Sequence, residues 1–170
     1  MRRGLLGLSA LAVAIALAVP MNAFGWVDDF FDGSASGQAV FEDMAVHPQA
    51  VRVGSTIYTV YQGDGLDPWI IAFDDSGAIR GPYKVGENPL AGGADPDDSH
   101  GAPSLLYDPV SKNLHVFWGA HASVLRHART TAPGNITKWT TYPAMIGSVT
   151  YPQVFRDDAG VAHLLSLIHI

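Results

Sequence analysis

From about residue 48 onward, the chain alternates short apolar runs with clusters of Gly, Pro, Asp and Asn. Short apolar runs bounded by turn residues predict β-strands, and no run in this part has the 3.6-residue period of an amphipathic helix. The expected strands are residues 50–53, 56–61, 69–73, 78–85, 105–107, 114–118, 124–128, 131–137, 139–142, 154–156 and 161–164. The pattern therefore predicts an all-β protein.

The clearest hairpin in this pattern lies between residues 97 and 123. Two apolar runs, Ala102–Tyr107 and Leu114–Trp118, flank a turn that is rich in Asp, Pro, Ser and Asn. His100 stands just before the first run, and His121 just after the second. Because the two ends of a hairpin lie side by side, both imidazoles are expected at one edge of the sheet.

Similar hairpins recur with a period of about fifty residues. Each opens with a proline that is followed by Gln or Ser, and these prolines are Pro48, Pro103 and Pro152. About four short strands fall in each period, which is typical of a β-propeller blade. A β-sandwich is the competing architecture, but it does not require a repeated strand start.

A propeller places several polar residues at one funnel. The loop that enters the first strand of a blade and the loop that leaves its second strand open on the same face. His100, His121 and Tyr151 occupy such loops, and His47 takes the corresponding place one blade earlier. Tyr151 precedes Pro152, which predicts an extended backbone for the tyrosine. These residues form the candidate site.

The other histidines have simpler interpretations. His115 and His163 hold matching positions in successive hairpins, where the first hairpin has Tyr58, so they are assigned to blade architecture. His127 either adds positive charge near the funnel or lies on a solvated strand face, and the second interpretation is favoured. The carboxylates of residues 95–98 lack the spacing of a calcium loop. A zinc ion on His100 and His121 would need a third ligand, and none stands at a motif spacing.

Composition narrows the class of protein. The 170 residues suit one domain, and 48% hydrophobic with 15% charged residues indicate a globular chain.

Residues 1–25 fit a signal peptide, with Arg2 and Arg3, an apolar stretch over Leu5–Val19, and a cleavage site at Ala23–Gly25. The mature protein is then expected to be secreted or periplasmic and free of the membrane; a retained N-terminal anchor is the alternative. The chain has no cysteine, so disulfides and thiolate metal sites are excluded.

The net charge of the chain indicates which classes of partner it can bind. Without the signal peptide, 8 basic residues face 16 acidic residues, a net charge of −8. This balance disfavours nucleic acid, while a local basic pocket can still hold an anionic glycan.

The last residues have an unusual sequence. Leu165–Ile170 matches the translation of a common sequencing adapter, and the alternative is a terminal apolar strand. The expected organisation is a signal peptide (1–25), the N-terminal part of a β-propeller domain (26–164), and a non-native tail (165–170). The propeller part amounts to about two and a half blades of a longer protein.

Three segments carry a resemblance to a known family. Asp98–Leu105, Leu114–His121 and Thr150–Gly160 resemble the BNR-repeat (bacterial neuraminidase repeat-like) β-propeller proteins, which include propeller-type ulvan lyases. The resemblance covers roughly Phe41–Leu164. It implies a seven-bladed, monomeric propeller that cleaves a uronate-containing, ulvan-like polysaccharide by β-elimination.

The resemblance also implies roles for residues. In the lyases, two histidines, a tyrosine and an arginine surround the uronate. The histidines match His100 and His121, the tyrosine matches Tyr151, and the arginine would fall just beyond Leu164. Which of the three is the acid and which the base stays open. This chemistry needs no cofactor, and a structural metal ion is compatible with the sequence.

Two other functions compete with the lyase. In a non-catalytic glycan-binding propeller, the same residues would only hold sugar. A sialidase-type hydrolase would need several arginines for one carboxylate and Ser-x-Asp-x-Gly-x-Thr-Trp boxes, and the sequence contains no such box. A scaffold propeller would bind no glycan.

Overall fold

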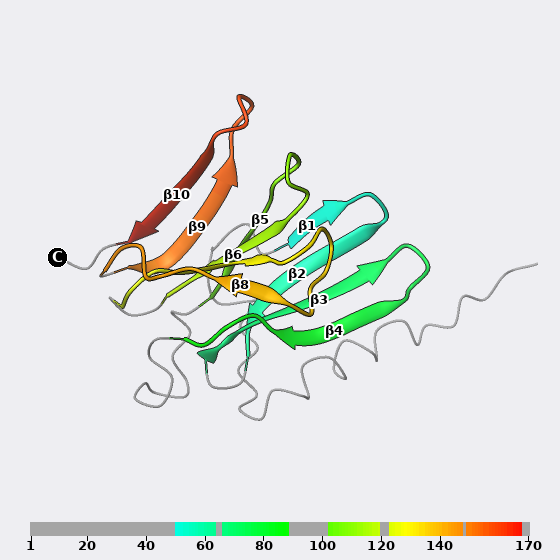
Figure 1. Ribbon diagram of the computed structural model, residues 1–170, viewed down its shortest axis with the longest axis horizontal. Coiled ribbons are helices and arrows are strands. Elements are labelled where there is room, and N and C mark those ends of the chain that lie inside the picture. The colour runs from blue at the N-terminus through cyan, green and yellow to red at the C-terminus, as the bar shows by residue number, and fades with distance from the viewer. Residues whose placement is uncertain (1–49, 64–65, 89–101, 120–122, 148, 168–170) are drawn as a thin grey trace, which may run out of the picture.

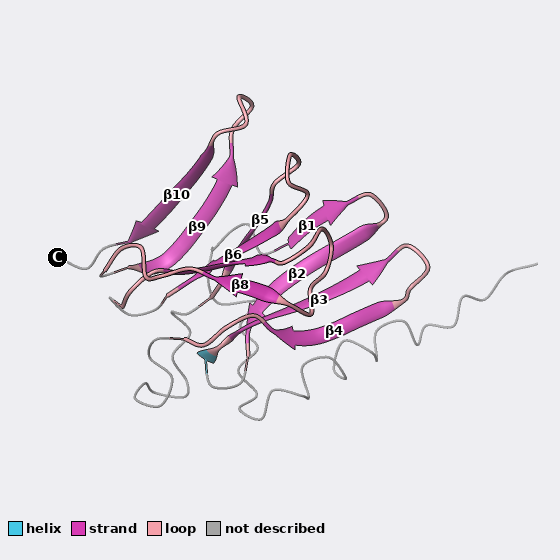
Figure 2. Cartoon of the chain, viewed as in Figure 1, coloured by secondary structure: helices cyan, strands magenta, loops and turns pink. Residues whose placement is uncertain are grey.

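The computed structural model describes residues 50–63, 66–88, 102–119, 123–147 and 149–167. Strands and loops make up nearly all of this part of the chain (Figure 2). The strands are β1 (Ala50–Val53), β2 (Thr56–Gln62), β3 (Pro68–Asp74), β4 (Ile79–Lys84), β5 (Ser104–Tyr107), β6 (Leu114–Trp118), β7 (Arg126–Thr130), β8 (Trp139–Thr141), β9 (Thr150–Arg156) and β10 (Ala162–Leu167).

The strands form antiparallel sheets in chain order. One four-stranded sheet has the order β1-β2-β3-β4, a second has the order β5-β6-β7-β8, and β9 pairs with β10 alone. The first strands of neighbouring sheets pack against one another, β1 on β5 and β5 on β9, so the sheets fan out from this side (Figure 1). The structure confirms the all-β prediction, with two complete blades and half of a third.

One expected strand is wrong, and two others begin two or more residues from the expected position. Residues 131–137 form turns, in which the Thr131 N–H donates to the Lys138 carbonyl (3.1 Å) and Asn135 Oδ1 accepts from the Thr137 hydroxyl (2.7 Å). Gly134 adopts a left-handed φ of 66°, which suits a turn and not a strand. The strand expected at 124–128 begins two residues later, at Arg126, and the strand expected at 154–156 begins four residues earlier, at Thr150.

The hydrophobic core lies between the first two blades. Its largest fully buried side chain is Trp118, whose indole N–H donates to the Glu87 carbonyl at 2.9 Å. A Cβ on Gly86 would lie 2.6 Å from the Trp118 ring, so the glycine permits this close approach. The buried core residues are Tyr58, Val60, Ile70, Ala72, Val85, Leu105, Leu114, Val116, Trp118, Ala128 and Ile136.

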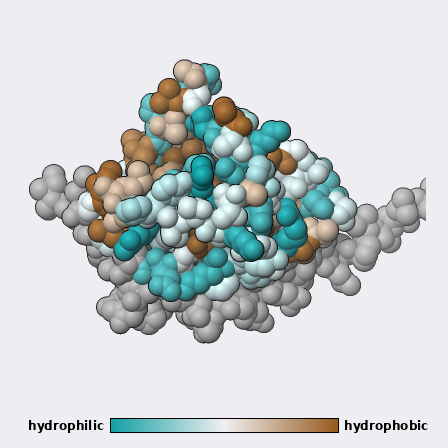
Figure 3. Space-filling view, viewed as in Figure 1, coloured by the Kyte–Doolittle hydropathy of each residue, from teal (hydrophilic) through white to brown (hydrophobic). Residues whose placement is uncertain are grey.

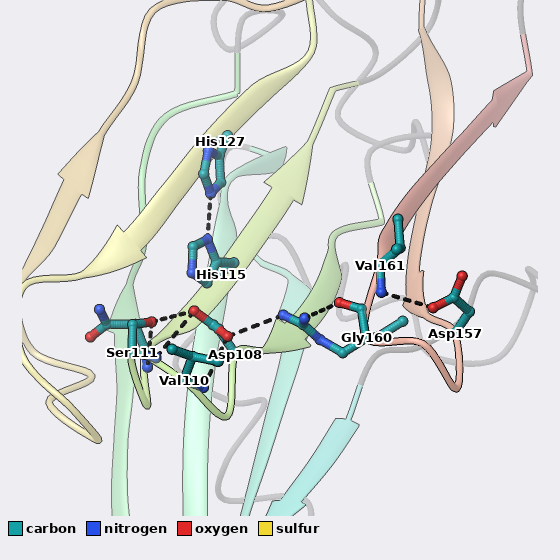
Figure 4. A network of polar contacts seen from close by, with 10 residues as sticks. Asp108, Val110, Ser111, His115, His127, Asp157, Gly160 and Val161 are labelled. Atoms are coloured by element: carbon teal, nitrogen blue, oxygen red, sulfur yellow. Dashed lines mark hydrogen bonds and ion pairs between the residues drawn. The ribbon is translucent and has the colours of Figure 1, made fainter.

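Aspartates stabilise three of the turns. Asp74, Asp108 and Asp157 each accept hydrogen bonds from backbone N–H groups two to four residues later. These bonds, together with side-chain bonds that are the largest cause in each case, hold the pKa of all three carboxyls below the usual range. Asp108 also pairs with Arg156 at 3.2 Å, which ties the second blade to β9 (Figure 4).

The half blade exposes several apolar side chains. Phe155, Val161 and Leu165 are 43%, 53% and 58% exposed. Hydrophobic groups gather where β9 and β10 lie, while much of the remaining visible surface is hydrophilic (Figure 3). Residues 165–167 continue β10, and 168–170 lie outside the described part, so the origin of this tail stays a prediction.

The proposed signal peptide also lies outside the described residues. Within the described ranges, no helix has the length and hydrophobicity needed to cross a bilayer.

Candidate functional site

The chain enters β5 and leaves β6 at the same end of the second blade. Ser104, at the start of β5, pairs with Phe117, near the end of β6. The described residues next to the predicted histidines, Ala102 and Gly119, therefore lie at this end. His100, His121 and His47 themselves fall outside the described residues, so their placement in a site stays a prediction.

Two contacts connect the His121 segment to the start of β9. After the segment, Ser123 forms a bridge with Val149, whose N–H donates to the Ser123 carbonyl at 2.8 Å. Before it, Gly119 packs so closely that an added Cβ would lie 3.0 Å from the Val149 side chain. Val149 is two residues from Tyr151. Both flanks of the His121 segment thus lie beside the strand that carries Tyr151.

Tyr151 lies in a β-bulge. Thr150 pairs with Leu167 and Gln153 with Leu165, so Tyr151 and Pro152 together oppose the single residue Ser166. Pro152 has no N–H to donate, which suits a position where the ladder is interrupted. The Ser166 hydroxyl accepts from the Thr150 N–H (3.1 Å) and donates to its carbonyl (2.9 Å).

The backbone of Tyr151 differs from the expectation. Its φ is 54°, in the left-handed region, whereas the following proline predicted an extended conformation. Such a conformation costs about 1–3 kcal/mol for a residue other than glycine. The bulge accounts for the difference, because the extra residue bends the strand and redirects one side chain. Tyr151 is half-buried at the end of β9 that is contacted by the described flanks of the His121 segment.

The arginine on β9 lies far from Tyr151. Five residues along a strand place Arg156 about 16 Å away, at the opposite end of the half blade. Its guanidinium pairs with Asp108 and donates to the Gly160 carbonyl. Within the described part of β9 and β10, Arg156 is the only arginine, so an arginine for a uronate is not placed beside Tyr151 here.

His127 is half-buried in a stack of aromatic rings. Its ring stacks between Phe117 and Tyr142, with centroid distances of 4.3 and 4.7 Å. Its Nε2 lies 2.9 Å from Nδ1 of His115, so one imidazole donates and the other accepts (Figure 4). Burial, followed by His115 and Arg129, lowers the pKa of His127 to about 4, and burial also lowers the pKa of His115. The lowered pKa argues against His127 as a positive charge, and its half-buried stack differs from the freely solvated strand face that was favoured, while the architectural assignment of His115 agrees with its position.

This histidine pair predicts acid sensitivity of folding. The unfolded imidazole binds a proton near pH 6.5, but the folded His127 binds one only near pH 4. The unfolded state therefore gains more protons as the pH falls, and stability is lost from about pH 6.5 downward. We expect a loss of about 1–2 kcal/mol in the free energy of unfolding between pH 7 and pH 5, measured by urea denaturation.

A matched pair of variants isolates the effect. His127→Phe keeps an aromatic ring in the stack but cannot titrate, so the free energy of unfolding of this variant should change less between pH 7 and pH 5 than that of the wild type. His163→Ala, which removes an exposed histidine paired with Asp157 at 2.8 Å, should retain the wild-type acid sensitivity. If the free energy of unfolding changed equally with pH in the wild type and in His127→Phe, His127 would not be the source of the acid sensitivity.

A cleft of about 570 Å³ lies beside this aromatic stack. Its lining comes from four segments: the residues after β4, the end of β6, the start of β7, and the end of β8. The lining residues are Gly86, Glu87, Asn88, Trp118, Arg126, His127, Thr141 and Tyr142. Sequence reasoning missed this cleft, because its segments are brought together only by the packing of two blades.

The described residues contain no group of three or more His, Asp or Glu side chains that could hold a metal ion. The expectation about cofactors therefore rests on the sequence alone.

Comparison with known proteins gives a family match and similar structures. The family described as "BNR repeat-containing family member" matches residues 73–165. An ulvan lyase from Alteromonas sp. (strain LOR) is 27% identical over 80% of this chain and 31% of its own length. A PL25 ulvan lyase from Pseudoalteromonas sp. (strain PLSV) is 26% identical over 93% of this chain and 36% of its own length.

A solved PL25 ulvan lyase bound to -[GlcA(1-4)Rha3S]- is similar in structure, with a TM-score of 0.68 and 25% identity. The match covers 76% of this chain and 34% of that one. This chain spans about a third of the length of the two curated relatives.

Proposed function

Because the chain belongs to the BNR repeat-containing family, we propose that it forms part of a lyase for a sulfated, uronate-containing polysaccharide of the ulvan type. The complete gene product would be a secreted or periplasmic, monomeric propeller. His100, His121 and Tyr151 would carry the reaction. The observation that supports this most is the identity to two ulvan lyases over 80% and 93% of the chain.

The reaction is a β-elimination. A base removes the proton at C5 of the uronate, next to the carboxylate, and its electron pair forms the C4=C5 double bond. The bond between C4 and the glycosidic oxygen breaks, and an acid gives that oxygen a proton. Negative charge develops on the carboxylate, so hydrogen-bond donors directed at it lower the barrier. Each imidazole of His100 and His121 is proposed either to donate to this carboxylate or to move one of the two protons.

The bulge supports a chemical role for Tyr151. A phenol can pass a proton only when it lies within hydrogen-bond reach of the reacting atom. The left-handed φ of 54° departs from ordinary strand backbone, and a bulge of this kind can redirect a side chain. The contacts of Ser123 and Gly119 with Val149 connect its strand to both flanks of the His121 segment.

Replacing Tyr151 with Phe tests this role with little change in shape. Loss of the hydroxyl is expected to lower kcat for ulvan by about 10²–10⁴-fold, while the unfolding midpoint stays near wild type. The rate is followed by the ultraviolet absorbance of the unsaturated uronate, using the complete gene product. A kcat within a few fold of wild type would remove Tyr151 from the proton transfer.

The same assay separates the lyase from its rival. A non-catalytic glycan-binding propeller would bind ulvan but give no unsaturated product from ulvan or from other uronate polymers. Binding without product would therefore favour the rival.

A further inference from the structure

The cleft between the first two blades has preformed walls. On one side, Trp118 is 2% exposed and its indole N–H bonds the Glu87 carbonyl at 2.9 Å. The neighbouring Asn88 is buried, and its N–H donates to the Asp67 carboxylate at 2.6 Å. The Trp118 bond holds the segment after β4 against the second blade, and the Asn88 bond holds it against the start of β3 in the first blade. A ligand entering the cleft would therefore meet ordered walls, which reduces the entropy lost on binding.

An aromatic ring forms the opposite wall. Tyr142 is half-buried, and its ring is nearly parallel to that of His127, at an angle of 8°. His127 is in turn parallel to Phe117, at 3°. The Tyr142 N–H also donates to the His127 carbonyl at 2.9 Å. This three-ring stack presents a rigid aromatic surface, against which the C–H face of a pyranose ring can pack.

Arg126 supplies the charge in the cleft. It is half-buried at the start of β7, and it forms no ion pair with another described residue. The nearby carboxylate, Glu87, is 83% exposed at the rim and lies 3.9 Å from the ammonium of Lys84. The planar guanidinium matches a carboxylate or a sulfate group in two-point geometry. In a chain with a net charge of −6, an arginine that has no ion pair among the described residues and lines an aromatic cleft favours an anionic ligand.

We propose that this cleft binds an acidic sugar residue, with Arg126 on its carboxylate or sulfate and Tyr142 against its ring. It would act as a subsite that holds the polysaccharide away from the reacting bond, so the inference rests on the proposed polysaccharide substrate. Arg126 and Tyr142 contribute to binding and take no part in proton transfer. The neutral His127 orients Tyr142.

Affinity electrophoresis with ulvan in the gel tests the subsite without relying on turnover. The starting protein is the complete gene product carrying His100→Ala and His121→Ala, which prevents the proposed cleavage. In this background Arg126→Ala should weaken binding about tenfold, as expected for losing hydrogen bonds to a charged group. Arg129→Ala is the matched control, because it removes an exposed arginine from the same strand that does not line the cleft.

Binding to chemically modified ulvan identifies the anionic group that Arg126 holds. If Arg126 holds the carboxylate, its effect should vanish with carboxyl-reduced ulvan; if it holds the sulfate, it should vanish with desulfated ulvan. Tyr142→Ala should weaken binding of all three polymers, and Tyr142→Phe should not.

Two results would overturn the subsite: equal losses for Arg126→Ala and Arg129→Ala, or no binding of any polymer by the starting protein. Binding through Arg126 in a protein whose wild type yields no unsaturated product would leave the subsite standing and reject the proposed lyase.

Discussion

Replacing either His100 or His121 with alanine is expected to reduce lyase activity on ulvan by about 10²–10⁴-fold in kcat. Each imidazole is proposed either to move a proton or to donate to the uronate carboxylate, and both tasks matter most in the transition state. The measurement is the initial rate of unsaturated uronate formation by the complete gene product. The double variant should lose little more than the worse single variant, because the residues act on one reaction centre.

His163→Ala provides the control for these variants. His163 lies on β10 and pairs with Asp157 at 2.8 Å near the turn, at the end of the half blade that is distant from Tyr151. Its side chain is 44% exposed, so its removal should change both activity and stability little. Loss of activity in His163→Ala equal to that in His121→Ala would contradict the placement of the site.

Replacing Trp118 with alanine is expected to destabilise the protein by about 3–5 kcal/mol. The indole is 2% exposed and fills the space between the first two blades, so its removal leaves a cavity and an unpaired Glu87 carbonyl. Urea denaturation of the complete gene product gives the free energy of unfolding. The variant should also lose the polysaccharide affinity attributed to the cleft, because Trp118 forms part of its wall.

Trp139→Ala is the matched control for Trp118→Ala. Trp139 has the same size and a similar bond, from its indole N–H to the Ile136 carbonyl at 2.9 Å, but it is only partly buried at the start of β8. Its loss should cost roughly half as much or less. If both variants were destabilised equally, contact between the blades would not be the source of the Trp118 effect.

Local sequence signals predicted most strands because turn chemistry is local. The Gly54-Ser55 turn and the Asp74–Gly77 turn separate apolar runs, and the structure places β1 to β4 around them. The expected strand at 131–137 failed for a related reason. Its threonines favour a strand, but Asn135 and Gly134 favour a turn, and the turn prevailed.

Long-range packing explains what the sequence could not show. Nothing near His127 in the sequence indicates that Phe117 and Tyr142 enclose it, so its burial and its pKa of about 4 were missed. The cleft around Arg126 escaped notice because it needs two blades to form.

The candidate site shows the same division between local and long-range information. The repeat placed Tyr151 in the loop that enters a strand expected at 154–156, whereas β9 begins at Thr150 and includes Tyr151. The left-handed backbone of Tyr151 depends on its pairing with β10, since the bulge exists only between the two strands. The preference of a residue before proline for an extended backbone depends only on those two neighbouring residues. Here the bulge between β9 and β10 outweighs that preference.

Mass spectrometry of the products formed from ulvan by the complete gene product tests the central claim most directly. β-Elimination predicts oligosaccharides that each carry an unsaturated uronate at the new non-reducing end and are one water lighter than the hydrolysis products. Products of hydrolytic mass, or intact ulvan after prolonged incubation with folded protein, would contradict the assignment of this chain to a lyase.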